Sequence, residues 1–206
     1  MPPVRPSGRR PILGLIVAGL LASLGPTPLL ADEPPKAGVV TTIQGRATVS
    51  RPIIPQPIPL KVKDDVLFRD RIDTRENSVV RLLLGGKALV TVRELSVFTV
   101  TEEPGRAVVD LQVGKLAVGV AKKLLNPGES IELRTPNAVA SIRGSYLMAD
   151  VQIVAGQPQT RFVSVDVSVP ITISPRANPT IQIPLGSNGG GRPLCALVYE
   201  EGPMKN

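Results

Sequence analysis

The sequence predicts an all-β fold: a single domain of stacked short strands, arranged either as a β-solenoid-like coil or as an irregular double-layer β-sheet. Turn signals recur about every 8 to 15 residues, a spacing typical of short strands. No segment after residue 31 has the apolar periodicity of an amphipathic helix, and 122–125 is too short to nucleate one. With 206 residues, 42% of them apolar, the chain fits one domain that can bury a core.

The first 31 residues have the features of a secretory signal peptide. Three arginines precede an apolar run from Ile12 to Leu24, and two prolines, Pro26 and Pro28, end it. As a helix this run would span about 20 Å, which is less than the roughly 30 Å of a bilayer core. We therefore expect cleavage after Ala31 and a periplasmic or secreted product, with an uncleaved short anchor as the alternative. Without residues 1–31, which carry three arginines and no acid, the net charge of +7 becomes +4.

The rest of the chain divides into three parts. We expect a lead-in at 32–37, the all-β domain at 38–185 and a flexible C-terminal tail at 186–206, which begins with the linker-like sequence GSNGGGR. Cys195 is the single cysteine, so no disulfide can form within the chain, and we interpret it as an incidental thiol.

Short apolar, β-competent runs mark the expected strands. Gly85-Gly86 between two of them is the strongest hairpin signal. The proline-rich segment 51–59 cannot be a central strand and should be an extended, exposed connection. In 115–121 one face is bulky, while Ala117, Gly119 and Ala121 leave the other nearly bare, as in a strand between two backbone layers. The expected strands are 39–43, 46–50, 79–84, 88–92, 97–101, 108–113, 115–121, 151–155 and 162–169, with short edge strands at 171–173 and 181–183.

The stretch from Glu132 to Tyr146 is the most particular part of the chain. A strand ends at a Thr-Pro step, which cannot continue a ladder, and a run of small residues follows. Small side chains allow a second layer of backbone to come close, so we expect an inner, tightly packed corner; an ordinary strand after a proline turn is the alternative. The residues assigned to this structural motif are Thr135, Pro136, Asn137, Ala138, Arg143 and Gly144.

A weak internal similarity supports stacked layers. The segments 71–77 and 130–137 both follow an acidic residue, both contain Ile, Thr and Asn in that order, and both lead into a strand. Two copies do not establish a repeat, but they suit a fold built of layers.

The chain resembles the FecR-like domain family over about residues 38–169. Five short pieces stand in that family's order: Gly45-Arg-Ala-Thr-Val49, Arg69-Asp-Arg-Ile72-Asp-Thr74, 78–84 with Gly85-Gly86, Leu111-Gln-Val-Gly114-Lys-Leu-Ala-Val118, and Thr135-Pro-Asn-Ala-Val139 with Ile142-Arg-Gly-Ser145. The resemblance implies an extracytoplasmic, solenoid-like β domain that takes part in cell-surface signalling. The chain departs from the family's regulators because no cytoplasmic helical region precedes the apolar run and little room remains after Val169. It therefore resembles a free-standing member, and direct control of a sigma factor is not expected.

The residue inventory favours a binding protein over an enzyme. Without histidine, neither a histidine-dependent nucleophile system nor a histidine-containing metal site can form. Only the carboxylate pairs Asp64-Asp65 and Glu102-Glu103 could act in acid–base catalysis, and we interpret them as solvated loop charge. We expect no cofactor and no metal. We also expect no nucleic-acid partner, since basic and acidic residues are interspersed. Two functions remain open: an interaction or sensing module with an envelope protein partner, or a glycan- or cell-wall-binding module, which would need grouped aromatic rings.

Overall fold

The computed structural model describes residues 35–103, 106–166, 171–179, 183–185 and 194–199, and most of them lie in strands. The predicted signal peptide falls outside these ranges. The described part contains one short 3₁₀ turn, η1 (Lys122–Leu124). The strands are β1 (Lys36–Gln44), β2 (Ala47–Arg51), β3 (Ile54–Pro59), β4 (Asp65–Leu67), β5 (Arg71–Thr74), β6 (Val79–Leu84), β7 (Ala88–Val92), β8 (Val97–Glu103), β9 (Arg106–Val120), β10 (Ser130–Arg134), β11 (Ala138–Ile142), β12 (Tyr146–Val154), β13 (Gln157–Asp166), β14 (Ile171–Pro175), β15 (Ile183–Leu185) and β16 (Leu194–Tyr199).

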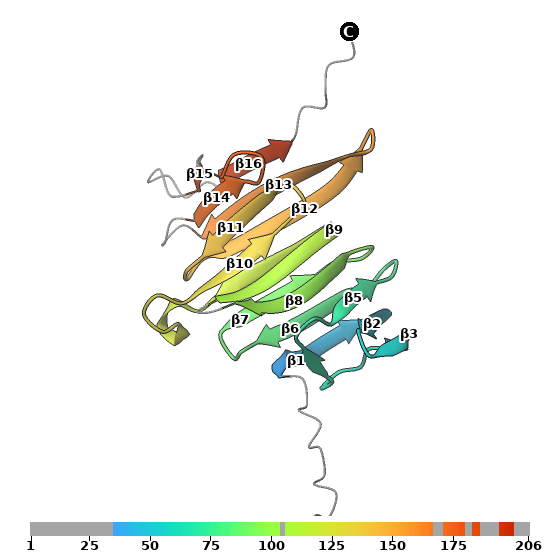
Figure 1. The fold of residues 1–206 in the computed structure, drawn as a ribbon. Coiled ribbons are helices and arrows are strands. Elements are labelled where there is room, and N and C mark those ends of the chain that lie inside the picture. Colours follow the sequence, from blue (N-terminus) through green and yellow to red (C-terminus); the bar gives the residue numbers. More distant parts are fainter. Residues whose placement is uncertain (1–34, 104–105, 167–170, 180–182, 186–193, 200–206) are drawn as a thin grey trace, which may run out of the picture. The chain divides into compact units, whose positions relative to one another are not determined.

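The strands form two sheets, and the chain crosses between them repeatedly. Sheet A has the order β4-β1-β6-β7-β9-β12-β13-β16. Sheet B has the order β3-β2-β5-β8-β9-β10-β11-β14-β15. Neighbours are antiparallel except β9 and β10, which are parallel. The strands follow one another along both sheets in nearly sequence order (Figure 1). The all-β prediction is confirmed, in its double-layer form.

Strand β9 belongs to both sheets. We expected two strands separated by Gly114, whereas the structure has one strand of 15 residues. Its first half pairs with β8 and β10 in sheet B, and its second half pairs with β7 and β12 in sheet A. Gly114 lies at the change of sheet with a φ of 97°, and a Cβ there would lie 2.5 Å from the Cα of Ser96. Glycine is required at this position both for its conformation and for the close approach.

The backbone opposite Gly114 carries a short motif that occurs twice and that the sequence analysis did not identify. It reads Arg-Glu-x-Ser, at 75–78 and again at 93–96. In both copies the serine hydroxyl donates to the glutamate carbonyl two residues earlier. It also accepts a hydrogen bond from the first backbone N–H after a glycine of a facing segment. For Ser78 the donor is Arg46, and for Ser96 it is Lys115. The repeated contact fixes the chain where β1 gives way to β2 and where β9 bends.

One continuous apolar core fills the space between the sheets. Strands alternate buried and exposed positions, as in β7, where Ala88, Val90 and Val92 are fully buried. The predicted hairpin at Gly85-Gly86 joins β6 and β7, with Leu84 opposite Ala88. Phe98 from sheet B and Phe162 from sheet A are the largest side chains of the core.

The outer edges of the sheets differ from the predictions at two places. The proline-rich segment is extended and exposed as expected, but it also pairs with β2 as the edge strand β3. Leu60 donates its N–H to the Ala47 carbonyl of β2. Because backbone N–H groups alternate sides along a strand, the nitrogens of Pro57 and Pro59 point away from β2, and proline has no N–H to offer at this free edge. At the other end, the expectation of a flexible tail over 186–206 is wrong for 194–199. This apolar run forms β16, which pairs with β13.

Candidate functional site

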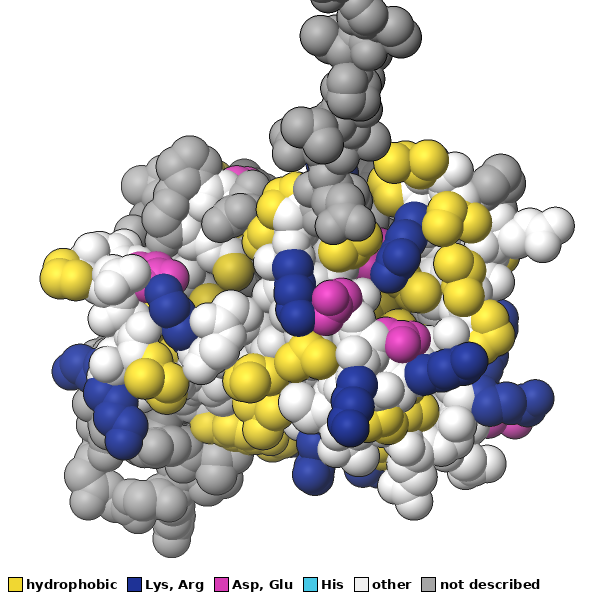
Figure 2. All heavy atoms as spheres, turned by 90° about the horizontal axis from the view of Figure 1, so that it is seen from below, with side chains coloured by type: hydrophobic (Ala, Val, Ile, Leu, Met, Phe, Trp, Pro, Cys, Tyr) yellow, Lys and Arg dark blue, Asp and Glu magenta, His cyan; other side chains and the backbone are white. Residues whose placement is uncertain are grey.

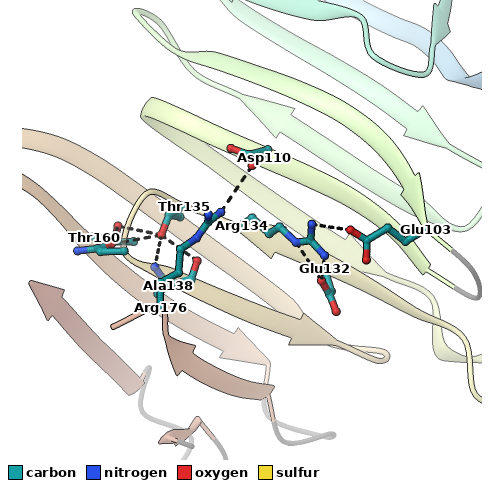
Figure 3. A network of polar contacts seen from close by, with 9 residues as sticks. Glu103, Asp110, Glu132, Arg134, Thr135, Ala138, Thr160 and Arg176 are labelled. Carbon is teal, nitrogen blue, oxygen red and sulfur yellow. Dashed lines mark hydrogen bonds and ion pairs between the residues drawn. The ribbon is translucent and has the colours of Figure 1, made fainter. Parts of the chain in front are cut away.

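The predicted corner lies between β10 and β11 and is closed by a buried polar cluster. Ala138 and Ala140 are fully buried, as a tightly packed corner requires. Thr135, also fully buried, donates its backbone N–H to the Ala138 carbonyl at 2.8 Å, and its hydroxyl accepts from the Ala138 N–H at 3.2 Å. The Thr160 hydroxyl of β13 lies 3.1 Å from that of Thr135 (Figure 3).

Asn137 joins the corner of sheet B to sheet A. Its side-chain nitrogen donates to the carbonyls of Pro158 in β13 and Val198 in β16, at 3.1 and 2.7 Å. Its side-chain oxygen accepts from the Thr160 hydroxyl at 2.5 Å. With 1% of its surface exposed, this side chain satisfies three polar groups on two strands that are distant from it in sequence. The cluster is therefore a structural lock and offers no group to a ligand.

The other motif residues lie at the surface of the corner. Pro136 and the Arg143 side chain are exposed. Gly144 has a φ of 104°, and a Cβ there would collide with the Lys122 side chain, so this position requires glycine where the chain leaves β11 for β12. The structure thus brings Thr135, Asn137 and Ala138 together inside and leaves Pro136 and Arg143 outside.

The internal similarity corresponds to a shared hydrogen-bond pattern. Thr74 is the last residue of β5, Thr135 directly follows the last residue of β10, and both are buried. Thr74 donates its N–H to the Ser96 carbonyl, and its hydroxyl accepts from the Ser96 N–H, which repeats the bonds between Thr135 and Ala138. In both cases the threonine ties the end of one strand of sheet B to a neighbouring segment.

The acidic residue that precedes β5 gives a pH-dependent prediction. Asp70 is 1% exposed, accepts from the Leu67 N–H at 2.9 Å and lies 3.3 Å from Arg51 Nε. Burial raises the pKa of Asp70, against the lowering by Leu67 and Arg51. Because its pKa is higher in the folded state, Asp70 contributes most to the free energy of unfolding when it is protonated. This contribution is present at low pH and is lost as the pH rises from the unfolded-state pKa of about 4 through the folded-state pKa.

We therefore expect the free energy of unfolding of Asp70→Asn, relative to that of the wild type, to be higher at pH 7 than at about pH 4. Urea unfolding of both proteins at the two pH values measures this difference in the free energy of unfolding. A difference that stays constant, or that changes in the opposite direction, contradicts the prediction.

The outer face of sheet B is polar, and its charges neutralise one another. Arg134 contacts Glu103 at 2.6 Å and Glu132 at 2.8 Å (Figure 3). Arg106 also pairs with Glu132. Hydrogen bonding to Arg134 lowers the pKa of Glu103. Two arginines therefore face two glutamates here, which leaves little charge for a partner.

The outer face of sheet A differs, because it carries a groove of about 460 Å³ across β7, β9, β12 and β13. We call this the sheet A groove and describe it as two rows, each with one residue from each of the four strands or their ends. The apolar row is Ala117, Met148 and Val163, with the polar Thr91 at its β7 end. The charged row is Arg93, Lys115, Asp150 and Arg161.

The groove exposes two large side chains with apolar surface. Tyr146 and Met148 are 36% and 37% exposed, and Tyr146 lies over Gly119, whose absent Cβ leaves space for the ring. The small residues of β9 lie between the larger side chains of its neighbours. The sequence showed this bare face, but we expected it to contact a backbone layer; it instead lies on the outer face of sheet A, where Ala117 lines the groove. A hollow with apolar lining and a few charged side chains beside it is typical of a binding site.

Three of the carboxylates considered for acid–base chemistry already have partners. Asp64 accepts from the Lys61 N–H, Asp65 pairs with Lys36 and Glu103 pairs with Arg134. Cys195 is exposed on β16. Among the described residues, no group of three acidic or cysteine side chains is placed to hold a metal ion. At the β1 end of the sheets, the surface shows Lys and Arg scattered among acidic and apolar side chains (Figure 2).

Comparison with protein-family models and with curated proteins finds no match for this chain. Within the described ranges, no helix has the length and apolar character needed to cross a membrane.

Proposed function

We propose that this chain is a non-catalytic interaction or sensing module of the bacterial envelope, periplasmic or secreted, that binds a protein partner through the sheet A groove. The observation that carries the proposal is the contrast between the two outer faces. Sheet B presents paired charges, whereas sheet A presents exposed Tyr146 and Met148 beside a row of cations. The signal-peptide pattern and the FecR-like resemblance support the compartment and a role in cell-surface signalling.

The glycan-binding alternative has less support. Sugar sites stack rings on grouped aromatic side chains. Phe98 and Phe162 are fully buried, and of the aromatic side chains that the structure describes only Tyr146 is exposed. A single ring beside a methionine and cations suits a peptide surface better than a sugar platform.

Capture of partners from bacterial envelope extracts tests the proposal. We expect the immobilised full chain to retain a specific protein that Met148→Glu fails to retain, because the new carboxylate lies in the apolar row. Leu124→Glu is the matched control, since Leu124 is similarly exposed but lies in η1, outside the groove. Equal capture by both variants, or no specific protein under several growth conditions, would overturn the proposal.

A further inference from the structure

The two rows of the groove have a fixed spacing. In each of the four strands, the residue of the charged row stands two positions from the residue of the apolar row, as Met148 does from Asp150 and Ala117 from Lys115. Two residues of a strand span about 6.8 Å. The apolar and charged rows therefore run side by side across the strands at about this distance.

The charged row is positive, and two of its cations are available. It holds three cations, Arg93, Lys115 and Arg161, and one carboxylate, Asp150, so its net charge is +2. Lys115 already contacts Asp150 at 3.4 Å. Within the described part of the chain, neither Arg93 nor Arg161 forms an ion pair, and Arg161 contacts only the Cys195 sulfur at 4.0 Å among the polar side chains. Arginine binds carboxylates through two parallel hydrogen bonds.

We infer that the sheet A groove binds an extended acidic peptide segment in which an apolar side chain and a carboxylate stand two residues apart. This inference rests on the proposed function and names its partner chemistry. A peptide lying along the strands repeats their spacing, so residues i and i+2 face the sheet about 6.8 Å apart. One then reaches the apolar row and the other reaches Arg93 or Arg161.

The floor and walls of the groove suit such a segment. Ala117 is small enough for a peptide side chain to lie above it, and Met148 can adjust its shape to that side chain. The charged row crosses four strands, or three spacings of about 4.8 Å, which is about 14 Å. This width fits one or two carboxylates of a peptide and not a long polyanion.

Fluorescence anisotropy with defined peptides tests the inference on the full chain. The probe is a fluorescein-labelled peptide of two Leu-Ser-Glu-Ser repeats, which places Leu and Glu on the same face. One comparison peptide has Gln in place of Glu. Another has two Leu-Glu-Ser-Ser repeats, with the same composition but with Leu and Glu on opposite faces. We expect the Gln peptide to bind about tenfold more weakly and the respaced peptide to bind several-fold more weakly.

Protein variants locate the contact. Arg93→Gln and Arg161→Gln are each expected to weaken binding of the acidic peptide by about tenfold, while the circular dichroism spectrum stays unchanged. Arg75→Gln, at an exposed arginine outside the groove, should leave binding unchanged. Raising the salt concentration should weaken binding of the acidic peptide and leave binding of the Gln peptide unchanged.

The outcomes separate this inference from the proposed function. Equal binding of the Glu and Gln peptides, insensitivity to both arginine variants, or tighter binding to phosphatidylglycerol vesicles than to the peptide overturns the acidic-peptide inference. If envelope capture still depends on Met148 in that case, only the partner chemistry is wrong. If the acidic peptide binds as expected but capture is independent of Met148, the proposed function fails alone.

Discussion

Replacing Gly114 with alanine is expected to destabilise the folded chain by about 4 kcal/mol or more, enough to unfold much of the protein at ambient temperature. At φ 97° an alanine would be strained, and its Cβ would lie 2.5 Å from the Ser96 backbone. Ser96 cannot retreat, because its hydroxyl holds the Lys115 N–H and its backbone holds Thr74. Chemical unfolding followed by circular dichroism measures the loss.

Gly128→Ala is the matched control for this prediction. Gly128 also has a positive φ, 84°, but nothing lies within 4 Å of a Cβ built there. It should cost about 1 kcal/mol from backbone strain alone. Similar losses in the two variants would show that the close approach between Gly114 and Ser96 contributes little.

Replacing Asn137 with alanine is expected to cost about 3 to 5 kcal/mol. The change removes the donor to the Pro158 and Val198 carbonyls and the acceptor of the Thr160 hydroxyl; the bonds to Val198 and Thr160 are buried, and the bond to Pro158 is partly buried. Because Val198 lies in β16, we also expect backbone amides of β16 to exchange hydrogen faster. Denaturant unfolding and hydrogen exchange measure the two effects.

Asn126→Ala provides the comparison at an exposed asparagine in the turn after η1. Its cost should stay within about 0.5 kcal/mol, as for most surface changes. A loss at Asn137 no larger than this, or unchanged exchange in β16, would contradict the role of Asn137 as a lock between the sheets.

Local patterns predicted the elements whose partners are near in sequence. Gly85-Gly86 fixed the β6–β7 hairpin because positive φ values at both positions match the twist of the strands. The small residues after Pro136 indicated a close-packed corner because only short side chains fit there. The polar partners of that corner, Thr160 and Val198, could not be predicted, since they come from strands that reach it through long-range pairing.

Three features were missed because their meaning depends on the topology of the sheets. In β9 the buried positions change from Val109 and Leu111 to Leu116 and Val118, a shift from odd to even that marks the change of sheet. This shift was present in the sequence, but we interpreted Gly114 as a break between two strands. The bare face of β9 was visible too, yet whether it meets backbone or solvent depends on what covers sheet A. Strand β16 pairs with β13, about 35 residues away, across a glycine-rich segment.

The sharing of β9 has a consequence for synthesis. Within the described strands, every ladder contact between those before β9 and those after it passes through β9. A nascent chain that has emerged only as far as residue 103 therefore has two unpaired borders, along β7 and β8. Those borders can pair with a neighbouring polypeptide until residues 106–120 cover both of them at once. The open borders then lie along β9 itself until β10 and β12 arrive, so one strand carries the exposed edge of both sheets.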